Sequence, residues 1–276
     1  MKFIDLQGLQ MPALGFGTWK LTGPDAAKAV DFALNEGYTH VDTAQIYENE
    51  AEVGDGIAQS GVTRDKIFLT TKVWRDRFAE NRVMESVDES LKKLKTDYVD
   101  LLLVHWPFPE TPVAKMVEEV MKALDAGKAK RIGVSNFTVA QTEEAIKVSG
   151  GKICNNQVEY HPYLSQEPVL ECARANKMAV TAYSPVARGK AIGDASLKEI
   201  GLKYGKSAGQ VTLRWLVQQD SVAAIPKSAT PDNIKNNLNI FDFELSDEDM
   251  KKIHALASPA GRLVNPDWAP QWDQAA

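Results

Sequence analysis

The chain has 276 residues, of which 44% are hydrophobic and 25% charged, the composition of an ordinary globular protein that can bury a large core. Its 32 basic and 37 acidic residues give a formal net charge of −5, with neither sign in a long block. This balance argues against a nucleic acid or an anionic membrane as the main partner. No apolar run approaches the roughly 18 residues of a membrane span, and the chain does not start like a signal peptide, so we expect a cytoplasmic protein.

The first predicted element is a small hairpin over Phe3 to Met11, with Gln7-Gly8 at its turn, which could plug the floor of a barrel. Short apolar runs then alternate with helical patterns along the rest of the chain. Eight runs predict strands: Leu14 to Gly17, His40 to Asp42, Ile67 to Thr71, Val99 to Val104, Arg131 to Val134, Asn156 to Glu159, Ala179 to Ala182 and Val222 to Ile225.

The segments between these runs repeat apolar residues every three or four positions, as at Val83, Val87 and Leu91, which is typical of amphipathic helices. Alternating strands and helices imply parallel strands joined by right-handed crossovers. Eight such units predict an α/β fold, the (β/α)8 TIM barrel. The alternative, a doubly wound dinucleotide-binding sheet, would carry a Gly-x-Gly-x-x-Gly fingerprint that this chain lacks. Because no linker divides the chain, we expect one domain over residues 1–276.

Polar and aromatic residues follow the predicted strands at the end where barrel enzymes place their active sites. They define one candidate site: Thr18, Trp19, Asp42, Tyr47, Lys72, Trp74, His105, Trp106, Ser135, Asn136, Gln157, Tyr183, Ser184, Lys227 and Ser228. A metal site is not predicted, because Cys154 and Cys172 lack metal-ligand spacing; we expect both to be buried, reduced thiols.

Four of these residues could carry out acid–base chemistry on a carbonyl group. The pKa of a free phenol is about 10, too high for efficient proton transfer at neutral pH, and a neighbouring ammonium favours the phenolate. We therefore expect Lys72 to lower the pKa of Tyr47 while Asp42 holds the ammonium in place. His105 could donate a hydrogen bond that orients the substrate. The hydride must come from a cofactor, because no side chain can supply one.

Each of the four also has an ordinary structural interpretation. Asp42 could cap a helix, Lys72 could be a surface charge, His105 could be a satisfied core histidine and Tyr47 could simply pack. Singly, these interpretations are favoured. The conjunction of four suitable residue types at the ends of three consecutive strands favours an active site.

A phosphate site is predicted after the last strand, where Lys227 and Ser228 precede Thr230 and Pro231. Thr230 suits the N-cap of a helix and Pro231 its first turn, so the free amides of that helix would point at the ligand of Lys227 and Ser228. The alternative is an ordinary capped helix beside a solvated lysine.

The motifs at these strand ends resemble those of the aldo-keto reductase superfamily, from Gln10 to Asp273. The resemblance is carried by Gly15 to Trp19, Gly37 to Ala44, Tyr47 with Asn49-Glu50, Thr71 to Trp74, Val104 to Pro107, Ile132 to Phe137, Asn156 to Glu159, Ala182 to Pro185, Ile225 to Ser228 and Phe241 to Leu245. Within the superfamily the chain is most similar to bacterial 2,5-diketo-D-gluconate reductases of the B type, which also reduce methylglyoxal. This closer similarity is carried by Asp42 to Tyr47, Arg262 to Pro266 and Ala269 to Asp273.

The resemblance implies NADPH-dependent reduction of small aldehydes and ketones by a tetrad in which Tyr47 is the general acid, accompanied by Lys72, Asp42 and His105. It also implies which residues hold the nicotinamide. Its carboxamide would be bound by Ser135, Asn136 and Gln157, and its ring would stack on Tyr183.

The rest of the cofactor is expected to contact the loops after the first, seventh and eighth strands. The resemblance matches Lys227, Ser228 and Thr230 to positions that bind the adenosine 2′-phosphate. Arg188 and Lys190 could reach the pyrophosphate or be solvated loop charges. The other residues assigned to the cofactor are Thr18, Trp19, Asp42, Ser184, Asn233, Asn236 and Asn237.

Two positions depart from the pattern of the superfamily. Many relatives carry arginine where this chain has Asn233 and glutamate where it has Asn236. Since an arginine there would clamp the 2′-phosphate or stack on the adenine, we expect only a modest preference for NADPH, with some use of NADH.

The substrate pocket is expected to consist of Trp19, Tyr47, Trp74, His105 and Trp106. Aromatic walls with few polar groups suit small aldehydes and ketones. The C-terminal residues Trp268 or Trp272 could fold over this face, or they could pack against the exterior of the barrel.

Two other functions are weighed against the reductase. One is a barrel lyase in which Lys72 forms a Schiff base, and the other is a module that binds the cofactor and senses redox state without turnover. The first does not explain the residues that accompany Lys72, and the intact tetrad argues against the second. Short loops without an apolar surface helix predict a monomer.

Overall fold

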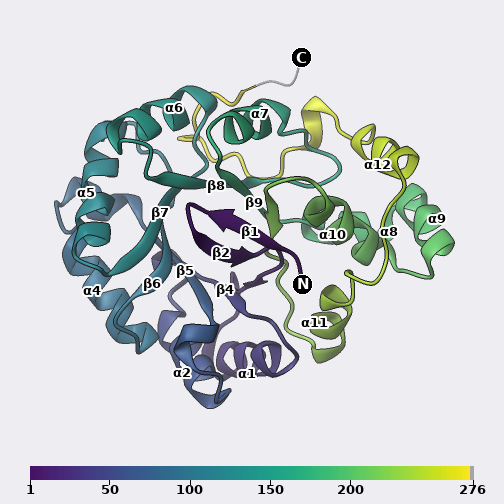
Figure 1. Ribbon diagram of the computed structural model, residues 1–276, viewed down its shortest axis with the longest axis horizontal. Coiled ribbons are helices and arrows are strands. Elements are labelled where there is room, and N and C mark those ends of the chain that lie inside the picture. The colour runs from purple at the N-terminus through teal and green to yellow at the C-terminus, as the bar shows by residue number, and fades with distance from the viewer. Residues whose placement is uncertain (274–276) are drawn as a thin grey trace.

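The computed structural model describes residues 1–273 and contains an eight-stranded sheet surrounded by helices (Figure 1). The strands follow one another in the order β10-β9-β8-β7-β6-β5-β4-β3, and all neighbours are parallel. Every predicted run overlaps one of these strands. Their bounds are β3 Phe16–Gly17, β4 His40–Asp42, β5 Phe68–Val73, β6 Val99–Val104, β7 Ala129–Ser135, β8 Ile153–Glu159, β9 Ala179–Tyr183 and β10 Val222–Ala224.

The sheet curls until its two edges are hydrogen-bonded to each other. A parallel bridge joins Leu14 to Ala224, and the Gly17 amide donates to the Pro226 carbonyl at 3.0 Å. The backbones approach so closely here that a Cβ on Gly17 would lie 2.7 Å from the Ile225 carbonyl oxygen, which explains the glycine. The core lies inside this curled sheet and between the sheet and the helices.

The helices cover the outer face of the sheet (Figure 1). In α4 the apolar residues Val83, Val87 and Leu91 are buried, as their spacing predicts. The bounds are α1 Gly23–Asn35, α2 Glu50–Gln59, α3 Arg75–Ala79, α4 Val83–Leu94, α5 Val113–Asp125, α6 Val139–Val148, α7 Glu167–Ala175, α8 Lys190–Gly193, α9 Ala195–Tyr204, α10 Ala208–Gln218, α11 Pro231–Leu238 and α12 Asp247–His254, with 3-10 turns over Gln45–Tyr47, Arg64–Lys66, Ala187–Gly189 and Pro259–Gly261.

The predicted N-terminal hairpin is present as β1 (Phe3–Leu6) and β2 (Leu9–Pro12), which pair antiparallel. Its turn residues Gln7 and Gly8 both have positive φ, 52° and 90°, as a two-residue hairpin turn requires. The Arg131 Nε, near the start of β7, donates to the Leu6 carbonyl at 2.9 Å. The hairpin therefore covers the end of the sheet at which the strands begin, and the opposite end stays open.

Both cysteines, Cys154 and Cys172, are free and buried, as predicted. Burial raises the pKa of the Cys154 thiol to about 12. Within residues 1–273, no helix combines the length and the apolar character that crossing a membrane would require.

Candidate active site

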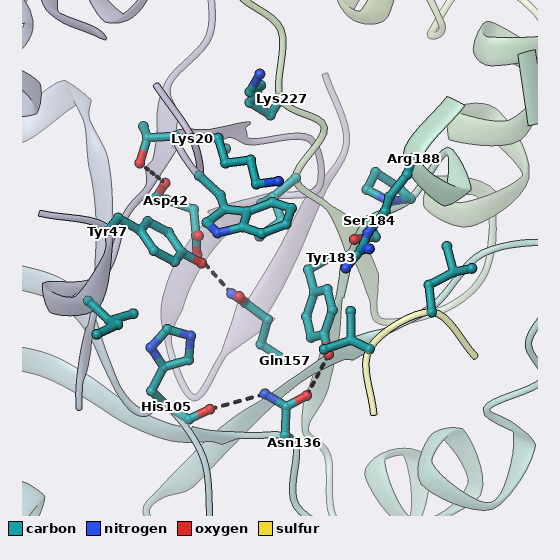
Figure 2. Close-up of a pocket in the computed structure, with 18 of the residues that line it drawn as sticks. Lys20, Asp42, Tyr47, His105, Asn136, Gln157, Tyr183, Ser184, Arg188 and Lys227 are labelled. Atoms are coloured by element: carbon teal, nitrogen blue, oxygen red, sulfur yellow. Dashed lines mark hydrogen bonds between the residues drawn. The ribbon is translucent and has the colours of Figure 1, made fainter. Parts of the chain in front are cut away.

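A cavity of about 850 Å³ lies at the carboxyl ends of the strands (Figure 2). Its volume is within the range of small-molecule and cofactor sites. The predicted residues that line it are Thr18, Trp19, Asp42, Tyr47, Trp74, His105, Trp106, Asn136, Gln157, Tyr183, Ser184, Arg188 and Lys227. Most of the candidate site identified in the sequence therefore lies around one cavity.

Lys72 lies beneath the wall of this cavity and is paired with Asp42. Its ammonium donates to the Asp42 Oδ1 at 2.6 Å, the Thr43 carbonyl at 2.8 Å and the Tyr47 hydroxyl at 3.3 Å. The side chains of Lys72 and Asp42 are 0% and 1% exposed. A surface charge and a solvent-facing helix cap are thus excluded for these two residues. The three ammonium protons have three acceptors, which is the condition under which a buried ion pair is tolerated.

Amide side chains on both sides of the turn that carries Tyr47 hold it in place by hydrogen bonds. Gln45 Nε2 donates to Ser90 Oγ at 3.1 Å, and Gln45 Oε1 accepts from the Trp74 amide at 3.0 Å. The buried Asn49 donates to the carbonyls of Thr18 and Leu21, both at 2.8 Å, and so connects this turn to the loop after β3. Sequence reasoning missed the positioning roles of Gln45 and Asn49, although both lie in the motif around Tyr47.

The pKa of Tyr47 shifts in the direction opposite to the prediction. Burial raises it above its ordinary value of 10, and the Lys72 ammonium opposes that rise without reversing it. Lys72 does act in the predicted direction, but the predicted net lowering was wrong because the loss of solvent around the phenol, which the prediction did not weigh, is the larger effect. Burial alone would lower the pKa of Lys72, but Asp42 and Tyr47 raise it, so the ammonium stays charged. At neutral pH, Tyr47 is a protonated donor beside a fixed cation.

His105 is buried and faces the same part of the cavity as Tyr47 (Figure 2). The centroids of the two rings are 5.7 Å apart. Burial, and then the charge of Lys72, lower the pKa of His105 well below 6.5, so its imidazole is neutral. Within residues 1–273 its Nδ1 has no hydrogen-bond partner, which distinguishes it from a satisfied core histidine.

The residues expected to hold the nicotinamide carboxamide are joined to the tetrad by hydrogen bonds (Figure 2). Gln157 Nε2 donates to Asp42 Oδ2 at 2.8 Å, and the Asn136 side chain donates to the His105 carbonyl at 3.1 Å and accepts from the Tyr183 hydroxyl at 2.8 Å. Asn136, Gln157 and Tyr183 line the cavity. Ser135 is buried behind them, where its hydroxyl donates to the Gln157 carbonyl at 2.7 Å.

At the other end of the cavity, Lys227 is exposed and forms no salt bridge with any described residue. Ser228 Oγ accepts from the Thr230 amide at 3.1 Å, directly before α11. Thr230 is the N-cap residue, as predicted, although its side chain makes no capping bond within the described chain. Of the residues predicted here only Lys227 lines the cavity; Ser228 and Thr230 do not. Nor do the three predicted residues on α11: Asn233 and Asn236, which are exposed, and Asn237, which is half-buried.

Cations from two loops meet over the exposed indole of Trp19. The Lys20 ammonium lies 4.5 Å and the Arg188 guanidinium 5.6 Å from the ring centroid. Lys190 instead lies over the Tyr163 ring, 4.0 Å from its centroid, and does not line the cavity. Of the two loop charges considered, Arg188 is therefore the one placed to meet a ligand.

The C-terminal segment forms one wall of the cavity. Trp268 lines it and makes edge-to-face contacts with Trp106 and Trp74, with ring centroids 5.0 Å and 6.2 Å apart. The interpretation that these tryptophans pack only on the exterior is therefore wrong for Trp268. Sequence reasoning missed other lining residues, some in the loops after the strands and some in the C-terminal segment: Lys20, Ile46, Ile192, Leu263, Val264, Asn265 and Pro266.

The site contains a protonated tyrosine beside a buried Lys–Asp pair, and it lies in an aromatic cavity at the strand ends of a curled parallel sheet. This arrangement is typical of enzymes that perform acid–base chemistry on a small ligand. The model of the aldo/keto reductase family matches residues 13–258. Methylglyoxal reductase DkgB of Salmonella typhi is 42% identical over 271 residues, which cover 96% of this chain and 100% of that protein. The chain belongs to the aldo/keto reductase family and is an oxidoreductase that reduces carbonyl groups.

Solved structures agree with this assignment. One that is provisionally assigned as a 2,5-diketo-D-gluconic acid reductase B is 49% identical, with a TM-score of 0.97, over 99% of this chain and 98% of that one. The aldo-keto reductase of Bombyx mori, solved in complex with NADP, is 35% identical with a TM-score of 0.86, over 93% and 92% of the two chains. Members of the family use NAD(P)H.

Proposed function

We propose that the protein reduces small aldehydes and ketones, such as methylglyoxal or 2,5-diketo-D-gluconate, to alcohols with NADPH, and that Tyr47 is the general acid. The observation that carries the proposal is the Tyr47 hydroxyl, 3.3 Å from a buried, charged Lys72 and facing His105 across an aromatic cavity. The similarity to methylglyoxal reductase DkgB and to the diketogluconate reductase structure supports the substrate class.

The residues of the tetrad have separate tasks. A carbonyl oxygen placed between Tyr47 and His105 receives the phenolic proton, while the neutral imidazole of His105 donates a hydrogen bond to orient it. The phenolate that remains on Tyr47 is stabilised by the Lys72 ammonium, which Asp42 holds in place at 2.6 Å. Reduced nicotinamide, when bound, supplies the hydride.

The donor set of the cavity fits a nicotinamide dinucleotide. The amides of Asn136 and Gln157 suit a carboxamide, and Tyr183 beside them offers an aromatic face. At the opposite end, Lys227 offers a cation for a phosphate, next to the start of α11. We assign the 2′-phosphate to Lys227, Ser228 and Thr230. Because Asn233 and Asn236 are neutral, the preference for NADPH over NADH is modest.

The proposal extends to the whole chain. We infer that residues 1–276 belong to a single domain. Its described part, residues 1–273, is a closed (β/α)8 barrel with the hairpin at its floor and the C-terminal segment over its active-site face. The hydrogen bonds that join the first and last strands support this description. The monomeric state stays a prediction.

The substitution Tyr47→Phe tests the proposed function. It keeps the ring but removes the proton donor, so we expect kcat for methylglyoxal reduction to fall by about 10²- to 10⁴-fold while NADPH binding is retained. Tyr98→Phe is the matched control, because Tyr98 lies outside the cavity between Arg64 and Lys130. Unchanged turnover in a folded, cofactor-binding Tyr47→Phe protein would refute the proposal. Negligible turnover by the parent enzyme on any aldehyde would favour a redox-sensing module.

A Schiff-base lyase is not supported by the geometry of Lys72. Its ammonium is charged, completely buried and hydrogen-bonded to three acceptors, so no free amine faces the cavity. Borohydride treatment in the presence of a carbonyl substrate should leave Lys72 unmodified.

A further inference from the structure

The cavity wall made by the C-terminal segment, residues 263–273, is attached to the sheet by one buried carboxylate. Glu159, at the end of β8, accepts the Leu263 amide on Oε1 at 2.7 Å and the Val264 amide on Oε2 at 2.8 Å. The same Oε1 lies 2.8 Å from His161 Nε2, and the Glu159 and His161 side chains are 0% exposed. A buried carboxylate with a donor on each oxygen is held strongly and cannot easily exchange these donors for water.

Glu159 belongs to a strand that also carries cavity residues. Gln157, two positions earlier on β8, donates to Asp42. Glu159 continues the same strand toward the C-terminal segment, so a single rigid element carries both groups. The position of the segment relative to the tetrad is therefore fixed, although 104 positions separate Glu159 from Leu263 in sequence.

The far end of the segment is attached to a second element. Asp273 Oδ2 accepts the amide of Val139, the first residue of α6, at 2.9 Å. Negative charge is favoured at a helix N-terminus, where the amides lack partners within the helix. Directly before the first attachment, the Arg262 guanidinium lies 3.8 Å from the centroid of Trp272, and between the attachments Trp268 packs against Trp74 and Trp106.

We propose that Glu159 and Asp273 are positioning residues that hold residues 263–273 as a fixed wall of the carbonyl site, and that Glu159 thereby determines how tightly small substrates bind. This inference rests on the proposed function, because the wall acts on the substrate of the tetrad. Neither residue touches the reacting atoms. Their loss should weaken substrate binding much more than it slows the chemical step or weakens cofactor binding.

The variant Glu159→Gln tests the first attachment. The amide nitrogen of the new glutamine would face a backbone N–H, so one of the two hydrogen bonds is replaced by a repulsive contact between two donors. The matched control is Glu167→Gln, which removes a carboxylate that is 46% exposed and pairs with Arg174 on the same helix, α7. We expect the KM for methylglyoxal to rise by roughly ten-fold in Glu159→Gln, with kcat and the NADPH dissociation constant within about two-fold of the parent.

A second readout does not depend on activity. Trypsin can cleave the Arg262–Leu263 bond only after the Leu263 amide has separated from the Glu159 carboxylate. This cleavage releases residues 263–276. We expect mass spectrometry to show this cut at least about ten-fold faster in Glu159→Gln than in the parent or in Glu167→Gln, because local opening governs proteolysis. If the parent turned over no carbonyl compound, the proposed function would fail, but this readout would still test the attachment.

Asp273→Ala provides an independent test if Glu159→Gln does not fold, since Asp273 lies near the end of the chain. It should show the same pattern of a raised KM and faster cleavage after Arg262. Equal cleavage rates in the variants and the control would overturn the attachment. Faster cleavage with an unchanged KM would overturn the role of the wall in substrate binding.

Discussion

Replacing Lys72 by methionine removes the cation on which the tetrad depends and keeps most of its volume. Asp42 would lose its 2.6 Å partner and retain the Gln157 amide at 2.8 Å, while the Thr43 carbonyl and the Tyr47 hydroxyl would also lose a donor. Breaking a buried ion pair costs about 3–5 kcal/mol, because a charge is left without compensation. For a protein of this size that lowers Tm by about 6–10 °C. We expect kcat to fall by at least about 10²-fold, since the Tyr47 phenolate loses its counter-ion.

A double-mutant cycle measures the effect directly. Urea unfolding and carbonyl reduction would be followed for the parent, Lys72→Met, Asp42→Asn and the double variant. Neutralising Asp42 in the Lys72→Met background removes the uncompensated charge, so the double variant should be more stable than Lys72→Met alone. Its activity should stay low, because the stabilising cation is still missing. If Lys72→Met unfolded at the same urea concentration as the parent, the account of the buried pair would be refuted.

Three further predictions follow from the same site. Because burial raises the pKa of Tyr47 above 10, kcat for reduction should stay constant from about pH 6 to about pH 9. A fall in kcat centred near pH 7 would contradict a Tyr47 phenol that stays protonated over this range. The pKa of His105 is well below 6.5 in the folded state, so the unfolded state binds more protons below about pH 6.5 and the stability of the protein falls as the pH drops. Urea unfolding should therefore show that His105→Asn loses less stability than the parent between about pH 7 and about pH 5. An equal loss in the two proteins would contradict a neutral, buried His105. Asn233→Arg, on the exposed face of α11, should tighten NADPH binding by roughly ten-fold and NADH binding much less, measured by fluorescence titration. Equal effects on the two cofactors would contradict the placement of the 2′-phosphate at this end of the cavity.

The sequence by itself predicted the eight strands and the residues that meet at the candidate active site. Buried parallel strands such as β6 (Val99–Val104) are largely apolar runs, here interrupted at Asp100, so their number and order are visible without the fold. Asp42, Lys72 and His105 lie at or directly after three successive runs. Since parallel strands end at the same edge, these residues had to meet, and Tyr47 follows Asp42 by only five positions.

Only the tertiary structure decided how that site is charged and enclosed. The direction of the pKa of Tyr47 depends on how much solvent the surrounding walls remove, and no local pattern reports that quantity. The bond from Gln157 to Asp42 and the attachment of Leu263 to Glu159 join residues 115 and 104 positions apart. Local propensities fix elements over a few residues, whereas contacts at such separations exist only after the sheet has curled and brought its strand ends together. The aromatic wall of the cavity is therefore a property of the folded chain, although the residues that build it can be read in the sequence.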